Sequence, residues 1–378
     1  MEVFNQKWEK VYRWVLAYID RNKFSGNLKL PSENDICRYL KVSRDTVRYA
    51  MKHLEEEGLI RRVRGSGTYF NRDVSISAAL DSGRADIKIG LILQGQDGDA
   101  EAELIRGVRS VIRDRQVDLR IFLTDNKFAN ERRCLQTVMH QNFQGFIVDG
   151  VKASMASPNL DCYQEVQRRG IPLIFFNNYY QNLHCARVGV NNNSSAKELI
   201  HLLVSAGHRE IAGIFVYDNY QSVEKFQGMF AALLTHGIEF RDDYIKWCIS
   251  NEAHDEKFAR SIWKFLKSIP RATAIVCCNY RIYRLVRQVL EAQGKRVPQD
   301  YSVVCFDYSA EGKEQEGITC SVYQGYTIGC RMAELLMRMI EREERGNRDY
   351  SLILRPEIYI GNSIKQMGER DFTPEQRG

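Results

Sequence analysis

The sequence has 378 residues, of which 44% are hydrophobic and 27% are charged. A chain of this length exceeds one ordinary domain, so at least two domains are expected. No run approaches the eighteen or so apolar residues of a membrane-spanning helix, and the charged N-terminus does not resemble a secretion signal. The ten cysteines form no CxxC pair. We therefore expect a cytoplasmic protein with no membrane span, no disulfide and no metal site.

The positive charge of the chain is confined to one end. Residues 1–72 hold 15 Lys and Arg against 9 Asp and Glu, whereas residues 73–378 hold 39 of each. The formal net charge of +6 therefore lies in the first fifth of the sequence. Such a concentration is typical of a segment that contacts nucleic acid phosphates.

The first two predicted elements are helices. Apolar residues recur at helical spacing from Trp8 to Ile19, which predicts a helix over about residues 4–22. Ser32 precedes acidic residues in the pattern of a helix N-cap, so a second, short helix should begin there. That helix would bury Ile36, Tyr39 and Leu40 on one face.

A third helix should follow after a tight turn, with Ser43 as its N-cap and Gly58 as the C′ residue just beyond its end. Its inward face would consist of Val47, Ala50, Met51 and Leu54. Its opposite face begins with Arg44, Asp45, Thr46 and Arg48. Two helices joined by a tight turn, the second starting with long polar side chains, indicate a helix-turn-helix.

Two short strands are predicted next, over residues 59–64 and 68–70, around the turn Gly65-Ser66-Gly67. Arg61, Arg62 and Arg64 lie along this hairpin, which forms a wing suited to the DNA backbone or minor groove. Exposed arginines or a glycine turn alone usually indicate ordinary surface. Their order and spacing together favour DNA binding.

The stretch from residue 30 to 70, which begins LPSENDICRYLKVSRDTVRYA, resembles the DNA-binding domain of the GntR family. The resemblance implies DNA contacts by Ser32, Arg44, Thr46, Arg48, Arg64 and Gly65. Asn34 stands where many relatives have Arg, so its contact is weakened or replaced. By their place in the same elements, we add Ser43, Arg61 and Arg62. The double-stranded operator sequence itself is not readable, because Arg binds both guanine and phosphate.

The rest of the chain alternates short apolar runs with helical stretches. Residues 73–86 are small and polar and indicate a linker. The apolar runs are IKIGLIL, LRIFL, GFIVD, IPLIFF, ARVGV, EIAGIFV, AIVCC and YSVVCF. Helical patterns between them cover residues 102–115, 196–206, 223–235 and 281–293. This alternation predicts an α/β fold with doubly wound parallel sheets.

Polar residues follow several of these predicted strands: Asp149, Asn177, Asn279 and Asp307. Ligands of parallel α/β sheets bind outside the carboxyl ends of the strands, so these side chains are candidate ligand contacts. The plainer interpretation is that they begin loops and cap helices. Both interpretations remain open at this level.

The stretches VGVNNNSSAKELIHLLVSAGHREIAGI and RVPQDYSVVCFD resemble the sugar-binding domain of lac-repressor-type regulators, which is similar to periplasmic sugar receptors. With the N-terminal match, the chain is similar to the GntR subgroup of arabinose-responsive regulators. The resemblance covers roughly residues 87–364 and implies two lobes, three crossover segments and a ligand in the cleft. It implies ligand contacts by Asp149, Asn177, Lys225, Asn279, Asp307 and Gln324.

Three positions depart from that family pattern. Position 177 is often Asp, position 225 is usually Arg, and Tyr280 stands where Asp commonly follows Asn279. Lys offers a point charge instead of a planar fork, and would suit a phosphate or carboxylate on the ligand. The remaining amides and carboxylates suit a polyhydroxyl ligand. Phe176, Tyr179 and Tyr280 are candidates for stacking on a sugar face, with core packing the plainer role for Phe176.

We therefore expect a homodimeric repressor of carbohydrate-utilisation genes whose operator affinity changes when a sugar or sugar derivative binds. An activator, or a response to a non-sugar or phosphorylated metabolite, is the alternative. An aminotransferase-like enzyme is disfavoured, since no cofactor lysine in a recognisable context is present. Residues 94–98 lack the GxGxxG spacing, so no cofactor is expected. Residues 365–378 should form a loose tail.

Overall fold

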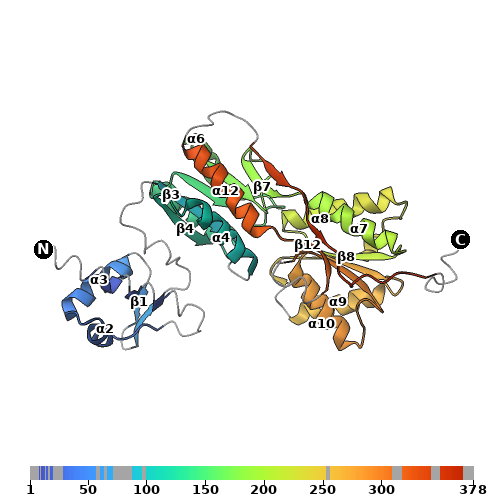
Figure 1. Cartoon of the computed structure of the whole chain (residues 1–378), viewed down its shortest axis with the longest axis horizontal. Coiled ribbons are helices and arrows are strands. Elements are labelled where there is room, and N and C mark those ends of the chain that lie inside the picture. The colour runs from blue at the N-terminus through green and yellow to red at the C-terminus, as the bar shows by residue number, and fades with distance from the viewer. Residues whose placement is uncertain are drawn as a thin grey trace.

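The structure is a computed structural model of the whole chain (Figure 1). It describes residues 8, 10–12, 14–15, 18–19, 29–56, 60–63, 66–70, 87–95, 99–252, 256–308, 317–341 and 350–368. The expected linker at 73–86, the expected helix end at Gly58, and the wing residues Arg64 and Gly65 lie outside these ranges. Within them, every helix is too short or too polar to cross a bilayer.

The N-terminal domain has the predicted helix-turn-helix and wing. Its described elements are α2 (Glu33–Leu40), α3 (Arg44–Glu56), β1 (Ile60–Val63) and β2 (Gly67–Phe70), and the described residues from Trp8 to Ile19 are helical. Ser32 caps α2 as expected: its Oγ accepts a hydrogen bond from the Asp35 amide at 3.2 Å, and the Asp35 carboxylate accepts one from the Ser32 amide. β1 and β2 pair antiparallel.

The predicted inward face of α3 is fully buried, with Val47, Ala50, Met51 and Leu54 at 0% exposure. Ile36 of α2 packs into the same core. The prediction for Tyr39 is wrong, because 72% of this residue is exposed. Tyr39 lies three positions after Ile36, at the edge of the buried face of α2. Its ring lies 5.4 Å from that of Trp14 and does not enter the core.

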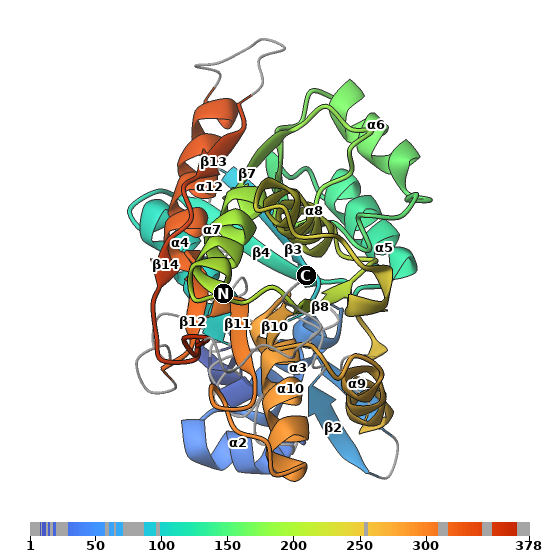
Figure 2. The ribbon, with the colours of Figure 1, turned by 90° about the vertical axis from the view of Figure 1, so that its right-hand side faces the viewer.

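The first lobe of the remaining chain, the N-lobe, is built on one parallel sheet. Its strands are β3 (Ile87–Leu93), β4 (Val117–Leu123), β5 (Gly145–Val148), β6 (Leu173–Phe176), β7 (Ala186–Val190) and β13 (Leu352–Leu354), in the order β4-β3-β5-β6-β7-β13. Figure 2 shows α4 (Asp99–Ile112) and α12 (Gly325–Ile340) on one face of the sheet, and α5 (Phe128–His140) and α6 (Leu160–Arg168) on the other.

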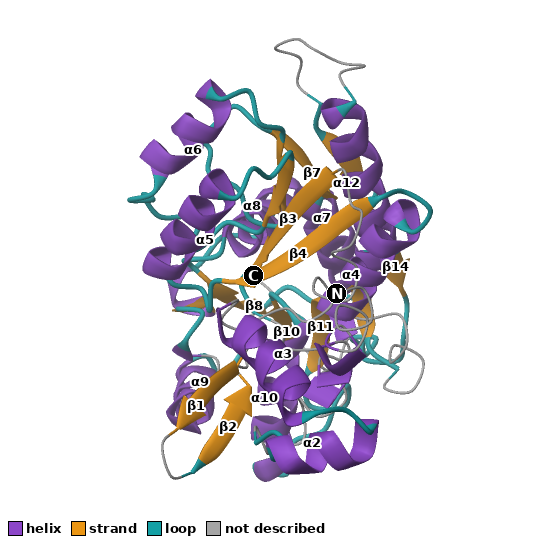
Figure 3. Ribbon diagram, turned by 90° about the vertical axis from the view of Figure 1, so that its left-hand side faces the viewer, coloured by secondary structure: helices purple, strands orange, loops and turns teal. Residues whose placement is uncertain are grey.

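The second lobe, the C-lobe, repeats this plan. Its sheet has the order β9-β8-β10-β11-β12-β14, parallel except for β14. The strands are β8 (Ile211–Val216), β9 (Ile245–Cys248), β10 (Ala274–Cys277), β11 (Ser302–Tyr308), β12 (Thr319–Val322) and β14 (Ile358–Tyr359). The helices are α7 (Asn192–Ser205), α8 (Tyr220–Thr235), α9 (Glu256–Ser268) and α10 (Tyr280–Ala292), with a short 3-10 turn, η2 (Asp242–Tyr244). Figure 3 shows the two sheets one above the other.

All eight apolar runs form strands, so the predicted fold class is confirmed. The strands β9, β13 and β14 have no counterpart among the runs, because they are short and mostly half-buried or exposed. β12 is fully buried but carries Thr319 and Ser321, which hide it from a search for apolar runs. Periodicity therefore finds strands at the centre of a sheet better than strands at its edge.

Three crossovers join the lobes, as the resemblance implies. The chain passes between them after β7, between β12 and α12, and between β13 and β14. The Asn191 amide donates to the Leu354 carbonyl at 3.0 Å, and Gln324 Nε2 donates to the Arg355 carbonyl at 2.8 Å. The crossovers are thus hydrogen-bonded to one another at one side of the molecule.

The chain stays attached to the C-lobe beyond residue 364, the expected end of the domain. The Met367 amide donates to the Ala206 carbonyl at 2.8 Å, and the His208 Nε2 lies 3.1 Å from the Lys365 carbonyl oxygen. Residues 369–378 of the expected tail lie outside the described part of the chain.

The closest helix packing in the N-lobe is between α4 and α12. Gly107 of α4 and Gly329 of α12 allow it, since a Cβ at position 107 would collide with the Tyr326 carbonyl and one at position 329 with the Leu104 carbonyl. This pair brings residues more than two hundred positions apart in the sequence against each other, and so holds the returning α12 on the N-lobe.

Replacing Gly329 by alanine should therefore destabilise the protein by about 2 kcal/mol or more, because both helix backbones must separate. Thermal unfolding measures the effect. Gly189→Ala is the matched control, since a Cβ there meets no atom within 4 Å. Equal midpoints for the two variants would contradict the close-packing argument.

Candidate functional site

The exposed start of α3 is the candidate DNA-binding surface. Arg44 and Arg48 are exposed, as are Ser32, Asn34, Ser43, Arg61 and Arg62. Thr46 is different, with 2% exposure. Its hydroxyl lies 2.7 Å from Ser43 Oγ, which also accepts from the Thr46 amide at 3.3 Å. Thr46 thus contributes to the cap of α3, and Ser43 caps that helix as predicted.

Glu33 of α2 contacts one arginine of α3 and one of β1. Its two carboxylate oxygens are each 3.4 Å from a guanidinium nitrogen, one of Arg48 and one of Arg62, and Arg62 also lies 3.4 Å from Glu55. Exposed pairs of this kind contribute at most about 1 kcal/mol. Glu33 thus holds the two arginines beside each other through weak ion pairs.

In the N-lobe, the two expected ligand residues follow neighbouring strands. Asp149 comes directly after β5 and Asn177 directly after β6. Asn177 adopts a positive φ of 51°, which asparagine tolerates better than most residues and which turns the chain sharply at the strand end. Burial raises the pKa of the Asp149 carboxyl to about 8, against hydrogen bonds from Asn178 that lower it.

In the C-lobe, Lys225 and Asp307 form an ion pair. Lys225 is 2% exposed; its Nζ donates to an Asp307 carboxylate oxygen and, at 3.2 Å, to the Cys278 carbonyl. Its charge is thus compensated within the protein. Asn279 caps α10, because its side-chain oxygen accepts a hydrogen bond from the Ile282 amide at 2.9 Å. The interpretation of this oxygen as a helix cap is therefore confirmed.

Tyr323, at the second crossover, shows that residues of both lobes converge. Its hydroxyl lies 3.4 Å from Asn177 Nδ2. Burial, followed by the negative charges of Glu101, Asp149 and Asp307, raises the pKa of this tyrosine. The contact with Asn177 thus joins the second crossover to the carboxyl end of β6.

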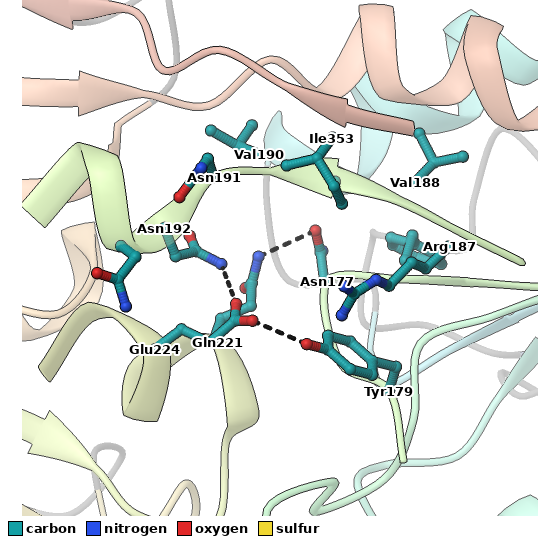
Figure 4. A pocket seen from close by; sticks show the side chains of 13 residues that line it. Asn177, Tyr179, Arg187, Val188, Val190, Asn191, Asn192, Gln221, Glu224 and Ile353 are labelled. Carbon is teal, nitrogen blue, oxygen red and sulfur yellow. Dashed lines mark hydrogen bonds between the residues drawn. The ribbon is translucent and has the colours of Figure 1, made fainter. Parts of the chain in front are cut away.

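A cavity of about 200 Å³ lies beside this region (Figure 4). It is at the hinge side of the cleft, which is the side where the crossovers join the two lobes. Of the six expected ligand residues, only Asn177 lines it. The other polar side chains around it are Tyr179 and Arg187 from the N-lobe, Asn191 at the first crossover, and Asn192, Asn193, Gln221 and Glu224 from the C-lobe. Val188, Val190 and Ile353 form the apolar wall.

The polar lining residues are tied together across the lobes. The Tyr179 hydroxyl donates to Glu224 Oε1 at 2.9 Å, and Asn192 Nδ2 donates to Glu224 Oε2 at 2.8 Å. The Arg187 guanidinium lies 4.5 Å from the centre of the Tyr179 ring. Gln221 Nε2 donates to Asn177 Oδ1 at 3.2 Å (Figure 4). One cation, one carboxylate and several amides give a nearly neutral pocket rich in donors and acceptors.

Sequence analysis missed Arg187, Asn192, Gln221 and Glu224. Arg187 lies inside a strand, and the other three lie in the first turns of α7 and α8, where polar residues are ordinary. The only available signal was an arginine within the apolar run ARVGV. Tyr179 lines the pocket, whereas Tyr280 packs edge-on against Tyr308 at 4.5 Å.

Comparison with protein-family models matches both parts of the chain. Residues 7–70 match the bacterial regulatory proteins of the gntR family, and residues 200–364 match a periplasmic binding protein-like domain. The chain is a transcription regulator that combines a GntR-type DNA-binding domain with a periplasmic-binding-protein-like domain. The matched N-terminal family and the similar curated proteins are transcription regulators.

The regulator resembles the arabinose metabolism transcriptional repressor of Geobacillus stearothermophilus, with 27% identity over 96% of this chain and 98% of that protein. The protein of the same name from Halalkalibacterium halodurans is 28% identical over 95% and 97%.

Solved structures agree with the fold. The transcription regulator CcpA of Lactococcus lactis superimposes with a TM-score of 0.65 at 18% identity, over 75% of this chain and all of that one. The complex of the regulator CelR with cellobiose superimposes with a TM-score of 0.64 at 20% identity, over 85% and 92%.

Asp149 should make the stability of the regulator dependent on pH. A carboxyl whose pKa is about 8 when folded and 3.8 when unfolded binds more protons in the folded state between these values. Stability therefore falls as pH rises from about 4 to 8. Asp149→Asn removes this term, so its unfolding free energy relative to wild type should rise by as much as about 1.4 kcal/mol per pH unit. Denaturant titrations at pH 5 and pH 8 measure the difference; a pH-independent difference would contradict it.

Proposed function

We propose that this regulator is a homodimeric, cytoplasmic repressor of carbohydrate-utilisation genes, and that a small neutral sugar is its effector. The observation that carries the proposal is a polar, nearly neutral pocket between the lobes of a chain whose other end has the GntR DNA-binding domain. The names of both arabinose repressors support a sugar. An activator is the alternative outcome of the same experiments.

The pocket favours a small uncharged ligand. Its volume of about 200 Å³ is below the roughly 300–1,000 Å³ of sites for drug-sized molecules. A sugar ring has hydroxyls that donate and accept, which matches the amides of Asn192 and Gln221 and the carboxylate of Glu224. Lys225 is compensated by Asp307, which disfavours the phosphorylated ligand considered from the sequence.

The effector would act on DNA binding through the lobes. Because the pocket walls belong to both lobes, a bound sugar favours one relative arrangement of them, and in a dimer that arrangement sets the spacing of two DNA-binding domains. Coupling of this kind is typically about 1–3 kcal/mol, or a roughly 5–150-fold change in operator affinity. A twofold dimer matches the symmetry of two half-sites.

For the DNA surface, the double variant Arg44→Ala plus Arg48→Ala should weaken operator binding at least about 30-fold, because each arginine contact contributes about 1–3 kcal/mol. Fluorescence anisotropy with DNA from upstream of the gene measures it. Arg168→Ala, an exposed arginine of α6 paired with Glu165, is the control. Unchanged operator binding by the double variant would contradict the assignment of the exposed start of α3 as the DNA-binding surface.

For the pocket, L-arabinose, D-ribose and cellobiose should be compared by thermal shift and calorimetry. At least one sugar should raise the midpoint, since a ligand of the folded state stabilises it. Glu224→Gln and Arg187→Leu should each weaken binding of that sugar about tenfold or more, because each removes a charged group that can hydrogen-bond to a sugar hydroxyl. Glu239→Gln, in the exposed segment after α8, should have no effect. Equal affinity in all three variants would exclude this pocket.

A further inference from the structure

The first amides of α8 have acceptors in two different lobes. A helix offers no carbonyl of its own to the amides of its first residues. Within the C-lobe, Asn219 accepts from the Ser222 amide through its side chain, at 3.0 Å, and from the Val223 amide through its carbonyl, at 3.2 Å. The two preceding amides, of Tyr220 and Gln221, point out of the C-lobe toward the N-lobe.

Asn178 of the N-lobe receives both amides. Its side-chain oxygen accepts from the Tyr220 amide at 2.9 Å and from the Gln221 amide at 3.4 Å. At its other end, Nδ2 donates to Asp149 Oδ1 at 2.9 Å, and its backbone amide donates to the same oxygen at 3.2 Å. The side chain is 2% exposed. The buried side-chain amide of Asn178 thus accepts hydrogen bonds from the C-lobe and donates one within the N-lobe.

No other common side chain of this size fills both roles. An amide has an acceptor for the helix amides and a donor for the carboxylate, whereas aspartate has no donor when ionised and leucine has neither group. An acceptor at a helix N-terminus is also favoured by the partial positive charge there. A buried donor or acceptor left without a partner is costly, so the contact is selective for asparagine at this position.

The position of Asn178 links the contact to the pocket. Its chain neighbours Asn177 and Tyr179 line one wall, and Gln221 and Glu224 of the first α8 turns line the opposite wall. Whatever fixes the start of α8 against the loop after β6 therefore fixes the spacing of the two walls.

We propose that Asn178 is a positioning residue. It connects the N-terminus of α8 to Asp149 of the other lobe by hydrogen bonds, a contact that we call the latch, and so holds the two pocket walls at a fixed spacing. The consequence of the latch for effector binding rests on the proposed function. The apparent affinity for the effector is proportional to the fraction of molecules whose pocket walls have the correct spacing, so loss of the latch lowers it.

Hydrogen exchange of the effector-free full chain tests the latch directly. In Asn178→Ala, the Tyr220 and Gln221 amides should exchange at least about tenfold faster than in wild type, because their acceptor is gone. The Ser222 and Val223 amides, with acceptors inside the C-lobe, should keep their protection. They serve as the internal control that the variant is folded.

A swap variant keeps the test decisive if the alanine variant does not fold. Asp149→Asn combined with Asn178→Asp reverses donor and acceptor between the two positions, and leaves an acceptor facing α8. It should protect the Tyr220 and Gln221 amides as wild type does. Wild-type protection of these amides in Asn178→Ala, or its loss in the swap variant, would overturn the proposal.

Calorimetry with L-arabinose tests the consequence. If the sugar binds wild type, Asn178→Ala should raise its Kd about tenfold. If neither L-arabinose nor any other sugar binds wild type, the proposed effector class fails, while the exchange result still decides the latch. Faster exchange with an unchanged Kd would leave the latch standing and overturn its role in the pocket.

Discussion

The topology of the two parallel sheets constrains the rest of the sensor. All strands of the N-lobe sheet run parallel, and in the C-lobe only β14 does not, so the loops at the carboxyl ends collect at one edge of each sheet. The three crossovers join the lobes and are hydrogen-bonded to one another. A ligand site between such lobes must be assembled from strand ends, crossovers and helix starts. Every polar residue of the pocket except Arg187 comes from one of these places.

Charge is handled differently in the two parts of the cleft. Lys225 and Asp307 neutralise each other in a buried pair, where removing one partner would leave the other uncompensated. At the hinge side, Glu224 is held by a tyrosine hydroxyl and an amide, with Arg187 stacked on the same tyrosine. The cavity therefore lies in the part of the cleft where hydrogen bonds, and not an ion pair, hold the polar side chains in place.

Local patterns explain which predictions from the sequence were confirmed. The helix-turn-helix is encoded within some forty residues: the Ser32 cap, the apolar face of α3 and the paired wing strands all depend on neighbours in the chain. Buried strands of the sensor are uninterrupted apolar runs and were equally readable. Tyr39 was misplaced because a short helix has a narrow buried stripe, and its edge depends on the helix packed beside it.

The resemblance gave six ligand positions, and the pocket includes one of them. Asn177 was found because it directly follows a strand, whereas Gln221, Glu224 and Asn192 begin helices, where polar residues carry no special signal. Asn178 was not singled out at all, since its role exists only when α8 approaches from a segment more than forty residues later.

The DNA-binding domain was thus determined by the sequence alone, because capping, helical periodicity and strand alternation are short-range effects. The effector pocket and the latch were decided by tertiary structure, because hydrogen bonds between lobes depend on a sheet order and three crossovers that no local pattern encodes.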